Sequence, residues 1–284
     1  MTTVLKLGGE LLEDAAGVAT AAAAIVRLSV RTPLVVVHGG GRAIDAELRA
    51  RGEEPRFVDG LRVTDGPALE AAVSVLAGRT NTTLVAALGA AGVRAVGLTG
   101  ADGPVGLSSQ ADSFRTVSGE TVDLGLVGEP CATDMTLLRD LLGLGYVPVV
   151  ASIGVTRRGE LLNVNADTLA GHLAAALGAA ELLIAGGTPG VLTADEQPIA
   201  QLSRDDMDAM IAAGTAHSGM LAKLAACRVA LDGGVTHVSI VSGRDASDYA
   251  EAAGTRILEG LLATSPGHAQ GGSSTAGRRP EGTA

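Results

Sequence analysis

The sequence has 284 residues, of which 46% are hydrophobic and 18% charged, so it holds enough apolar material for a substantial core. Its net charge is −10 and aromatic residues make up only 1%, which excludes the basic, aromatic-bearing surface of a typical nucleic-acid-binding protein. No apolar run reaches the ~18 residues of a membrane span, and no signal peptide opens the sequence. We therefore expect a cytoplasmic protein with no nucleic-acid or membrane partner.

Short apolar segments alternate along the chain with longer segments rich in alanine and leucine. The short segments predict buried strands at 4–7, 34–38, 95–98, 146–151, 181–185 and 237–242. The longer segments predict helices at 17–29, 42–51, 67–77, 80–91, 133–142, 166–177 and 219–231. This alternation predicts an α/β fold with a largely parallel central sheet.

Two segments interrupt the alternation, and both predict hairpins, at 116–122 and 154–162. The second hairpin marks a boundary near residue 157, between an N-terminal lobe (1–157) and a C-terminal lobe (158–263). Residues 264–284 are rich in Gly, Ser, Pro and Thr without an apolar period, and we expect a disordered tail there. Cys131 and Cys227 form no CxxC pair, which favours two buried thiols over a disulfide.

Two glycine-rich segments follow predicted strands. The first strand carries Lys6 within an apolar run and ends in Gly8 and Gly9. A buried lysine is costly unless it meets an anion, although it could also extend to the strand's edge. The second strand ends in His38 and the triple glycine 39–41. Backbone N–H groups at such a helix start suit an anion, although three glycines could also serve only a tight turn. Neither segment has P-loop or GxGxxG spacing.

Three further segments carry polar residues beside predicted helices: Arg62 in 60–65, Asn163 to Asp167 in 162–167, and Lys223 in 218–223. An arginine fork matches a carboxylate, but Arg62 could also pair with a surface acid. Asn165 or Asp167 could be a helix cap, and Lys223 could be a solvated surface lysine. Taken together, two lysines, glycine loops, an arginine and an aspartate favour phosphoryl transfer, which depends mainly on positioning and charge neutralisation.

In their order and spacing these motifs resemble the amino-acid kinase family, and within it most closely the acetylglutamate kinase branch. The resemblance spans residues 3–260 and rests on Lys6-Leu7-Gly8-Gly9, His38-Gly39-Gly40-Gly41, Gly60-Leu61-Arg62-Val63-Thr64, Asn163-Val164-Asn165-Ala166-Asp167 and Gly219-Met220-Leu221-Ala222-Lys223. It implies a three-layer αβα sandwich around a mainly parallel, roughly eight-stranded sheet. The N-terminal lobe would bind the acyl amino acid and form a homodimer, and the C-terminal lobe would bind ATP with Mg²⁺.

The activity that the resemblance implies is phosphorylation of the side-chain carboxylate of N-acetyl-L-glutamate by ATP, a step of arginine biosynthesis. The implied catalytic residues are Lys6, Lys223 and Asp167. The implied substrate-binding residues are Gly40, Gly41, Arg62 and Asn163. The implied phosphate- and nucleotide-binding residues are Gly8, Gly9, Gly187, Thr188, Gly190, Gly219 and Met220. No general base is required, because a carboxylate with a pKa of ~4.3 is already ionised at neutral pH.

The chain departs from the family pattern in the segment 185–190, where Gly187 stands in place of an expected aspartate. This departure puts ATP affinity and nucleotide preference in question. Two alternatives stay open. One is a sister kinase that acts on another acid, such as an N-blocked aminoadipate. The other is a catalytically impaired member of the family that serves as a ligand-binding or regulatory subunit.

Overall fold

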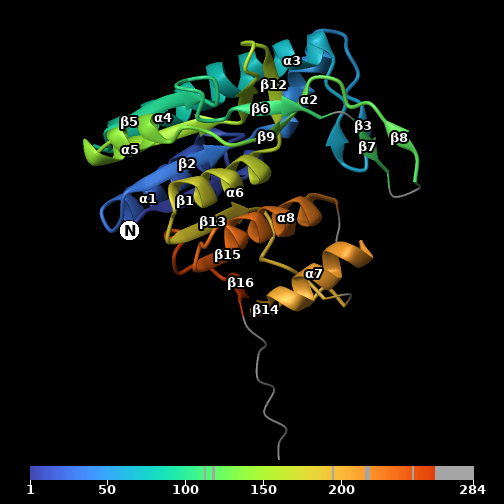
Figure 1. Cartoon of the computed structure of the whole chain (residues 1–284). Coiled ribbons are helices and arrows are strands. Elements are labelled where there is room, and N and C mark those ends of the chain that lie inside the picture. The colour runs from blue at the N-terminus through green and yellow to red at the C-terminus, as the bar shows by residue number, and fades with distance from the viewer. Residues whose placement is uncertain (112, 117–118, 194, 215–217, 245, 260–284) are drawn as a thin grey trace, which may run out of the picture.

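Eight strands form the central sheet of the computed structural model, which describes residues 1–111, 113–116, 119–193, 195–214, 218–244 and 246–259 (Figure 1). Their order across the sheet is β14 (Gln201–Ser203), β16 (Gly254–Leu258), β15 (His237–Ser242), β13 (Glu181–Gly186), β1 (Thr3–Leu7), β2 (Leu34–His38), β10 (Val147–Ala151) and β5 (Ala95–Thr99). All neighbouring pairs are parallel except β15 with β16, which is antiparallel. The expected α/β fold with a mainly parallel eight-stranded sheet is confirmed.

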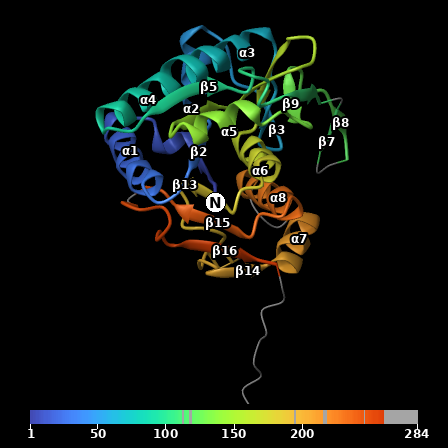
Figure 2. The ribbon, with the colours of Figure 1, turned by 60° about the vertical axis from the view of Figure 1, so that its left-hand side comes forward.

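Helices cover both faces of this sheet and make it the middle of three layers (Figure 2). On one face lie α1 (Ala15–Ser29) and α4 (Asn81–Ala90), whose buried side chains pack with Leu5 and Leu7 of β1. On the other face lie α5 (Thr136–Gly143), α6 (Ala166–Leu177) and α8 (Ser218–Asp232), which pack with Val4. Because side chains alternate along a strand, Lys6 shares the face of Val4 and points toward α6.

Smaller sheets lie beside the N-terminal half of the main sheet. β11 (Ile153–Val155), β12 (Leu161–Val164), β9 (Val127–Pro130) and β6 (Ser108–Gln110) form a four-stranded sheet, and β3 (Phe57–Val58) pairs with β4 (Leu61–Arg62). The predicted hairpin at 154–162 is the antiparallel pair β11–β12. The hairpin predicted at 116–122 is the pair of β7 (Phe114–Arg115) and β8 (Thr121–Val122), with residues 117–118 outside the described part of the chain.

One prediction about the helices was wrong. The segments 67–77 and 80–91 were expected to be separate, but α3 (Gly66–Val73) continues through a π-helical turn (Ser74–Thr80) into α4 without a break. The whole run, residues 66–90, is long and apolar enough to cross a membrane by length and composition alone. Core helices pass the same test, and the buried apolar residues of this run belong to two core clusters: Ala68, Ala71, Ala72, Val75, Leu76, Leu84 and Leu88.

The remaining elements agree with the sequence to within a few residues. The six predicted strands are β1, β2, β10, β5, β13 and β15, and α2 (Gly41–Ala50) and α6 begin and end close to the predicted bounds. α7 (Arg204–Ala213) and β14 were not predicted. Cys227 is buried and Cys131 half-buried, and both are free thiols. The lobe boundary near 157 stays a prediction, and the expected tail at 264–284 lies outside the described residues.

Candidate active site

The candidate site lies where the carboxyl ends of five parallel strands meet at one edge of the sheet. Gly8 follows β1, Gly39 follows β2, Ser152 follows β10, Gly187 follows β13 and Gly243 follows β15. In open α/β sheets, ligands bind in the crevice outside these strand ends. The sheet order therefore collects segments that are far apart in sequence into one location.

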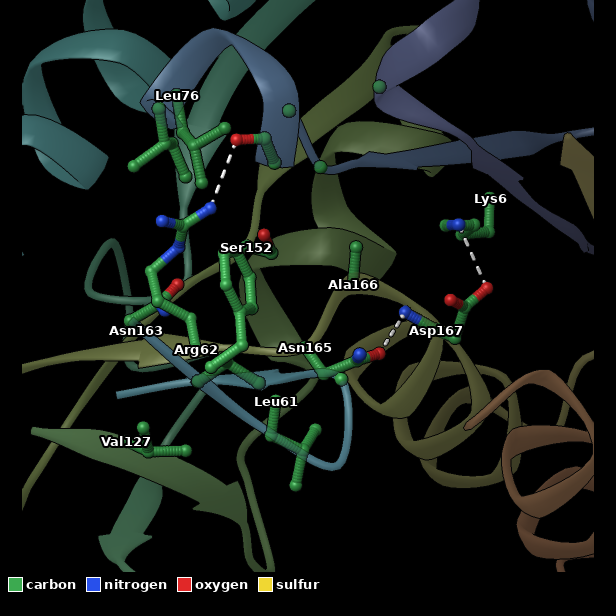
Figure 3. A pocket seen from close by; sticks show the side chains of 18 of the residues that line it. Lys6, Leu61, Arg62, Leu76, Val127, Ser152, Asn163, Asn165, Ala166 and Asp167 are labelled. Atoms are coloured by element: carbon green, nitrogen blue, oxygen red, sulfur yellow. Dashed lines mark hydrogen bonds and ion pairs between the residues drawn. The ribbon is translucent and has the colours of Figure 1, made fainter. Parts of the chain in front are cut away.

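Two lysines meet at one carboxylate in this site. The Nζ atom of Lys6 lies 2.9 Å from Oδ1 of Asp167, and the Nζ atom of Lys223 lies 3.7 Å from Oδ2 (Figure 3 shows the Lys6 pair). The side chains of Lys6, Asp167 and Lys223 are only 6%, 8% and 15% exposed. Lys6 and Lys223 are also the only two lysines in the sequence. The three predicted catalytic residues are thus brought together from β1, α6 and α8.

The start of α6 holds Asp167 in place. Asn165 occupies the N-cap position, where its side-chain oxygen accepts hydrogen bonds from the backbone N–H groups of Asp167 (2.9 Å) and Thr168 (3.1 Å). The helix-cap interpretation was therefore correct for Asn165. Asp167 lies in the first turn, where the helix dipole favours a negative charge. A capped, rigid helix start fixes the carboxylate that both lysines share.

The two glycine loops pack backbone against backbone above this ion pair. A Cβ atom at Gly9 would lie 2.5 Å from Cα and 2.8 Å from N of Gly40, closer than a real Cβ comes to any atom. Glycine is therefore required at Gly9 for the loops to approach each other. This contact lies at the start of α2, whose first-turn backbone N–H groups suit an anion.

A cavity of about 260 Å³ opens beside these loops and the lysine–aspartate pair. Seven predicted site residues line it: Lys6, Gly9, Gly40, Gly41, Arg62, Asn163 and Asp167. Figure 3 shows Arg62 and Asn163 on one side of the cavity and Lys6 with Asp167 on the other. The cavity therefore presents a carboxylate-matching group and a phosphate-matching group at opposite sides.

Arg62 is held firmly at its side of the cavity and keeps one donor group free. Its Nη2 atom lies 2.6 Å from Oδ1 of Asp45 and donates to the carbonyl oxygen of Gly41 at 3.0 Å. Its guanidinium also stacks on Phe57, 4.7 Å from the ring centroid. The Nη1 atom is buried without a hydrogen-bond partner. A buried, unpaired donor is costly, so this atom is suited to donate a hydrogen bond to a carboxylate oxygen of a ligand.

Asn163 reaches the same cavity from β12. Its Nδ2 atom donates to Oγ1 of Thr64 at 3.1 Å, which fixes the orientation of the amide beside the strand pair that carries Arg62. Phe57, which pairs with Arg62 in the β3–β4 hairpin, is 50% exposed although it lines the cavity. The hairpin therefore covers one side of the cavity with one of the chain's two phenylalanines.

His38 is not placed for proton transfer. It is fully buried, its Nδ1 lies 3.1 Å from the carbonyl oxygen of Gly39, and its Nε2 lies 3.0 Å from Nδ2 of Asn81. Since a carbonyl only accepts and an amide nitrogen only donates, the ring carries its proton on Nδ1. Burial lowers the pKa of His38 to about 4, although the Gly39 carbonyl raises it in part. The neutral ring anchors the start of the glycine loop.

Two charged residues at the site were not predicted from the sequence. Glu10 directly follows the glycine pair, and its Oε1 accepts a hydrogen bond from the backbone N–H of Gly187 at 2.7 Å. A Cβ atom at Gly187 would lie 3.3 Å from Cγ of Glu10 and 3.1 Å from Nε of Arg244. The space where the resemblance expects an aspartate side chain is therefore taken by these two side chains. Their only signal in the sequence was their position just after β1 and β15.

The other predicted nucleotide-binding residues lie along the same edge but outside the cavity lining. Gly219 belongs to the first turn of α8, where its carbonyl oxygen accepts a hydrogen bond from Lys223, and Met220 packs on the core. Thr188 is exposed. Gly190 has a φ of 113° and lies so close to Thr255 that a Cβ would be 2.6 Å from its Oγ1, which explains the glycine structurally. Roles for these residues in nucleotide binding stay predictions.

Within the described residues no cluster of three or more His, Cys, Asp or Glu side chains could hold a metal ion by itself. Both oxygens of Asp167 face lysines. Mg²⁺ in nucleotide sites is usually held by phosphate oxygens, water and one or two carboxylates. The residues present therefore fit a Mg²⁺ ion that arrives with the nucleotide, and they do not form a separate metal cage.

Comparison with known proteins agrees with this geometry. Residues 1–242 match the model of the amino acid kinase family. The acetylglutamate kinase of Symbiobacterium thermophilum is 42% identical over 247 residues, which cover 86% of this chain and 84% of that protein. The acetylglutamate kinase of Methanothermobacter thermautotrophicus is 36% identical and covers 85% of each chain.

Solved structures share the fold. The N-acetylglutamate synthase of Neisseria gonorrhoeae, solved with coenzyme A and N-acetyl-glutamate, superposes with a TM-score of 0.78 at 26% identity; the match covers 92% of this chain and 60% of that longer one. Giardia carbamate kinase superposes with a TM-score of 0.66 at 15% identity, covering 91% of this chain and 99% of that one, which shows the fold alone. On the family match and the identity to its curated relatives, this chain belongs to the amino acid kinase family.

Proposed function

We propose that this protein is an acetylglutamate kinase, which transfers the γ-phosphoryl group of ATP to the side-chain carboxylate of N-acetyl-L-glutamate. The observation that carries the proposal is the cavity between the guanidinium of Arg62 on one side and the lysine pair at Asp167 on the other. The free Nη1 of Arg62 suits the α-carboxylate of the acceptor, and the lysine pair at Asp167 suits the transferring phosphoryl group. The relatives named acetylglutamate kinase, 36–42% identical over most of the chain, support the same acceptor.

In this reaction a carboxylate oxygen of the acceptor attacks the γ-phosphorus while the bond to the ADP oxygen breaks. The products are N-acetyl-L-glutamyl 5-phosphate and ADP, and no proton has to move. Lys6, near the glycine loops, would neutralise charge on the phosphoryl oxygens, and Lys223 would do so from the nucleotide side. Asp167 orients both ammonium groups. Mg²⁺ carried by ATP supplies further charge neutralisation on the phosphates.

The acceptor is held by groups at the other side of the cavity. Arg62 and Asn163 would bind its α-carboxylate, and the backbone N–H groups of Gly40 and Gly41 would hold the reacting carboxylate against the phosphate. Since the attacking group is already ionised, neutral His38 has no catalytic duty. The protein would act in the cytoplasm as a homodimer in arginine biosynthesis, with Mg²⁺–ATP as co-substrate.

The acceptor assignment is tested by trapping the acyl phosphate. The protein is incubated with ATP, Mg²⁺ and hydroxylamine, and hydroxamate is measured with N-acetyl-L-glutamate, L-glutamate, L-aspartate and an N-acetylated aminoadipate. We expect product mainly with N-acetyl-L-glutamate. Product with another acid alone would identify a sister kinase, and none with any acid would indicate a ligand-binding member of the family. Light scattering after size exclusion tests the dimer.

A further inference from the structure

The Glu10 carboxylate lies inside a small enclosure made by three glycines from two loops. A Cβ atom at Gly8 would lie 2.5 Å from both of its oxygens, and one at Gly186 would lie 3.3 Å from Oε1. The Gly187 N–H closes the enclosure by donating to Oε1 at 2.7 Å. No larger residue fits at Gly8 while the carboxylate stays there. Because these three glycines have no side chains, the enclosure has room for one anionic group.

The same enclosure has the features of a phosphate subsite. It lies between the loop after β1 and the loop after β13, at the carboxyl edge of the sheet, and it offers the backbone N–H of Gly187. Lys6 and Lys223 both act on the Glu10 carboxylate electrostatically. In the proposed function these two lysines face the transferring phosphate. A carboxylate and a phosphate thus require the same donors and the same charges.

Glu10 is anionic under the conditions in which the enzyme would work. Burial, the largest influence on its pKa, raises it, but hydrogen bonds from the backbone N–H groups of Glu10 and Gly187 and the charges of Lys6 and Lys223 together lower it below its usual value. The side chain nevertheless remains half-exposed, on a short 3₁₀ turn (Gly9–Leu11) at the cavity wall. It can therefore leave the enclosure by side-chain rotation.

We propose that the Glu10 carboxylate is an internal occupant of the subsite for the terminal phosphates of ATP, and that the nucleotide binds by displacing it. Glu10 thereby sets the nucleotide affinity of the free protein. This inference rests on the proposed function, since it takes the enclosure to be the nucleotide side of that site. Only protein molecules in which Glu10 has left the enclosure can bind ATP. The apparent dissociation constant for ATP therefore equals the intrinsic constant divided by the fraction of such molecules.

Calorimetric titration with Mg²⁺–ATP and with AMP tests the proposal on three proteins: wild type, Glu10→Gln and Glu10→Ala. An anion held by charge-assisted bonds should reduce ATP affinity by about tenfold. We therefore expect Glu10→Ala to bind ATP about tenfold more tightly than wild type, with Glu10→Gln in between. AMP lacks the terminal phosphates, so its affinity should change less than twofold.

Glu13→Gln is the matched control. Glu13 lies three residues after Glu10, and its exposed side chain pairs with Arg42, so the substitution removes one negative charge outside the enclosure. It should leave ATP binding as in wild type. Weaker ATP binding by Glu10→Ala would overturn the proposal and make Glu10 a group that holds the nucleotide or its metal. Equal affinity in a variant that unfolds like wild type would also overturn it.

The binding measurement needs no acceptor, so it separates this inference from the proposed function. Tighter ATP binding by Glu10→Ala in a protein that forms no hydroxamate from N-acetyl-L-glutamate would keep the inference and reject the acceptor. Hydroxamate formation by the wild type, together with unchanged or weaker ATP binding by Glu10→Ala, would keep the acceptor and reject the inference.

Discussion

Lys223 and Lys6 approach one carboxylate from different elements, and they do so at different distances, 3.7 and 2.9 Å. In the proposed reaction, the longer contact and the larger exposure of Lys223 would let it follow a phosphoryl group as charge builds on the leaving oxygen. An interaction that is strongest in the transition state affects turnover more than binding.

Replacement of Lys223 by alanine should therefore lower kcat by about a hundredfold or more. The KM for N-acetyl-L-glutamate should change by less than about threefold, because Arg62 and Asn163 lie on the opposite side of the cavity from Asp167, which Lys223 contacts. Steady-state hydroxamate assays measure both constants. An unchanged kcat would remove Lys223 from the mechanism.

The buried His38 makes stability depend on pH. Its pKa is about 4 in the folded protein because burial disfavours the imidazolium, whereas an unfolded histidine titrates near 6.5. Below pH 6.5 the unfolded state binds a proton that folded His38 does not. The free energy of unfolding should therefore fall as the pH drops from 6.5 toward 4, by about 3 kcal/mol from this residue.

Urea unfolding at pH 7, 5.5 and 4.5 measures this effect. His38→Gln should flatten the pH dependence, although half-buried His172, whose pKa is also lowered by burial, will retain a part of it. His237→Gln is the control, because that ring is exposed, and it should unfold with the pH dependence of wild type. Equal slopes for all three proteins would contradict the assignment of a neutral His38.

At the level of elements, the ion-pair geometry depends on how closely α6 and α8 approach. Gly171 of α6 faces α8, where a Cβ atom would lie 2.5 Å from the carbonyl oxygen of Ala226 and 3.0 Å from its Cα. Since α6 carries Asp167 and α8 carries Lys223, any separation of the helices also separates these two charges.

Gly171→Ala should lower the free energy of unfolding by about 2 kcal/mol, because the helices must move apart to admit the methyl group. It should also lower kcat, since Lys223 shifts relative to Asp167. Gly89→Ala on α4 is the matched control: no atom lies within 4 Å of its Cβ position, so helix propensity alone should raise stability by about 0.5–1 kcal/mol. Equal effects of the two substitutions would contradict the close contact.

The elements also show where sequence patterns were sufficient. The strands of the sheet centre are short, fully buried segments rich in valine and leucine, and α6 begins at an asparagine cap, so the local sequence was sufficient to predict both. α7 was missed because it is polar and contacts the core mainly through Met207. The π-helical turn was missed because Gly78 and Thr80 look like a break, whereas tertiary packing of Val75 and Leu76 holds the helix together.

For the site, motifs identified the residues whose types are costly to bury, such as Lys6, Arg62 and Asp167, because such groups need partners. The Glu10 enclosure could not be predicted, because it depends on which side chain after β1 turns toward the loop after β13. Residues 10 and 187 become neighbours only when β1 and β13 pair, which the local sequence does not specify.

At the level of the whole molecule, the site is supported by the middle of the sheet. β1, β2 and β13 are each paired on both sides and covered by helices, whereas β14 and β5 are edge strands. Stability in a protein varies in this way, with edges opening before central strands.

Hydrogen exchange measured by mass spectrometry should reflect this order. Amides of β1, β2 and β13 should exchange only on global unfolding, and those of β14 and β5 earlier. Peptides that contain Lys6 should therefore be among the slowest in the protein. Faster exchange in β1 than in β14 would show that the site-bearing strand opens locally.

The pair of lysines at Asp167 has one more consequence, for covalent chemistry. All other basic side chains of the sequence are arginines or histidines. Lys6 and Lys223 therefore carry the only primary amines on side chains of the protein. A small amine-selective acylating reagent can therefore modify, besides the α-amino group, only Lys6 and Lys223. Apart from the α-amino group, no other amine of the molecule contributes background, so the rate of incorporation at these two lysines reports occupancy of the site.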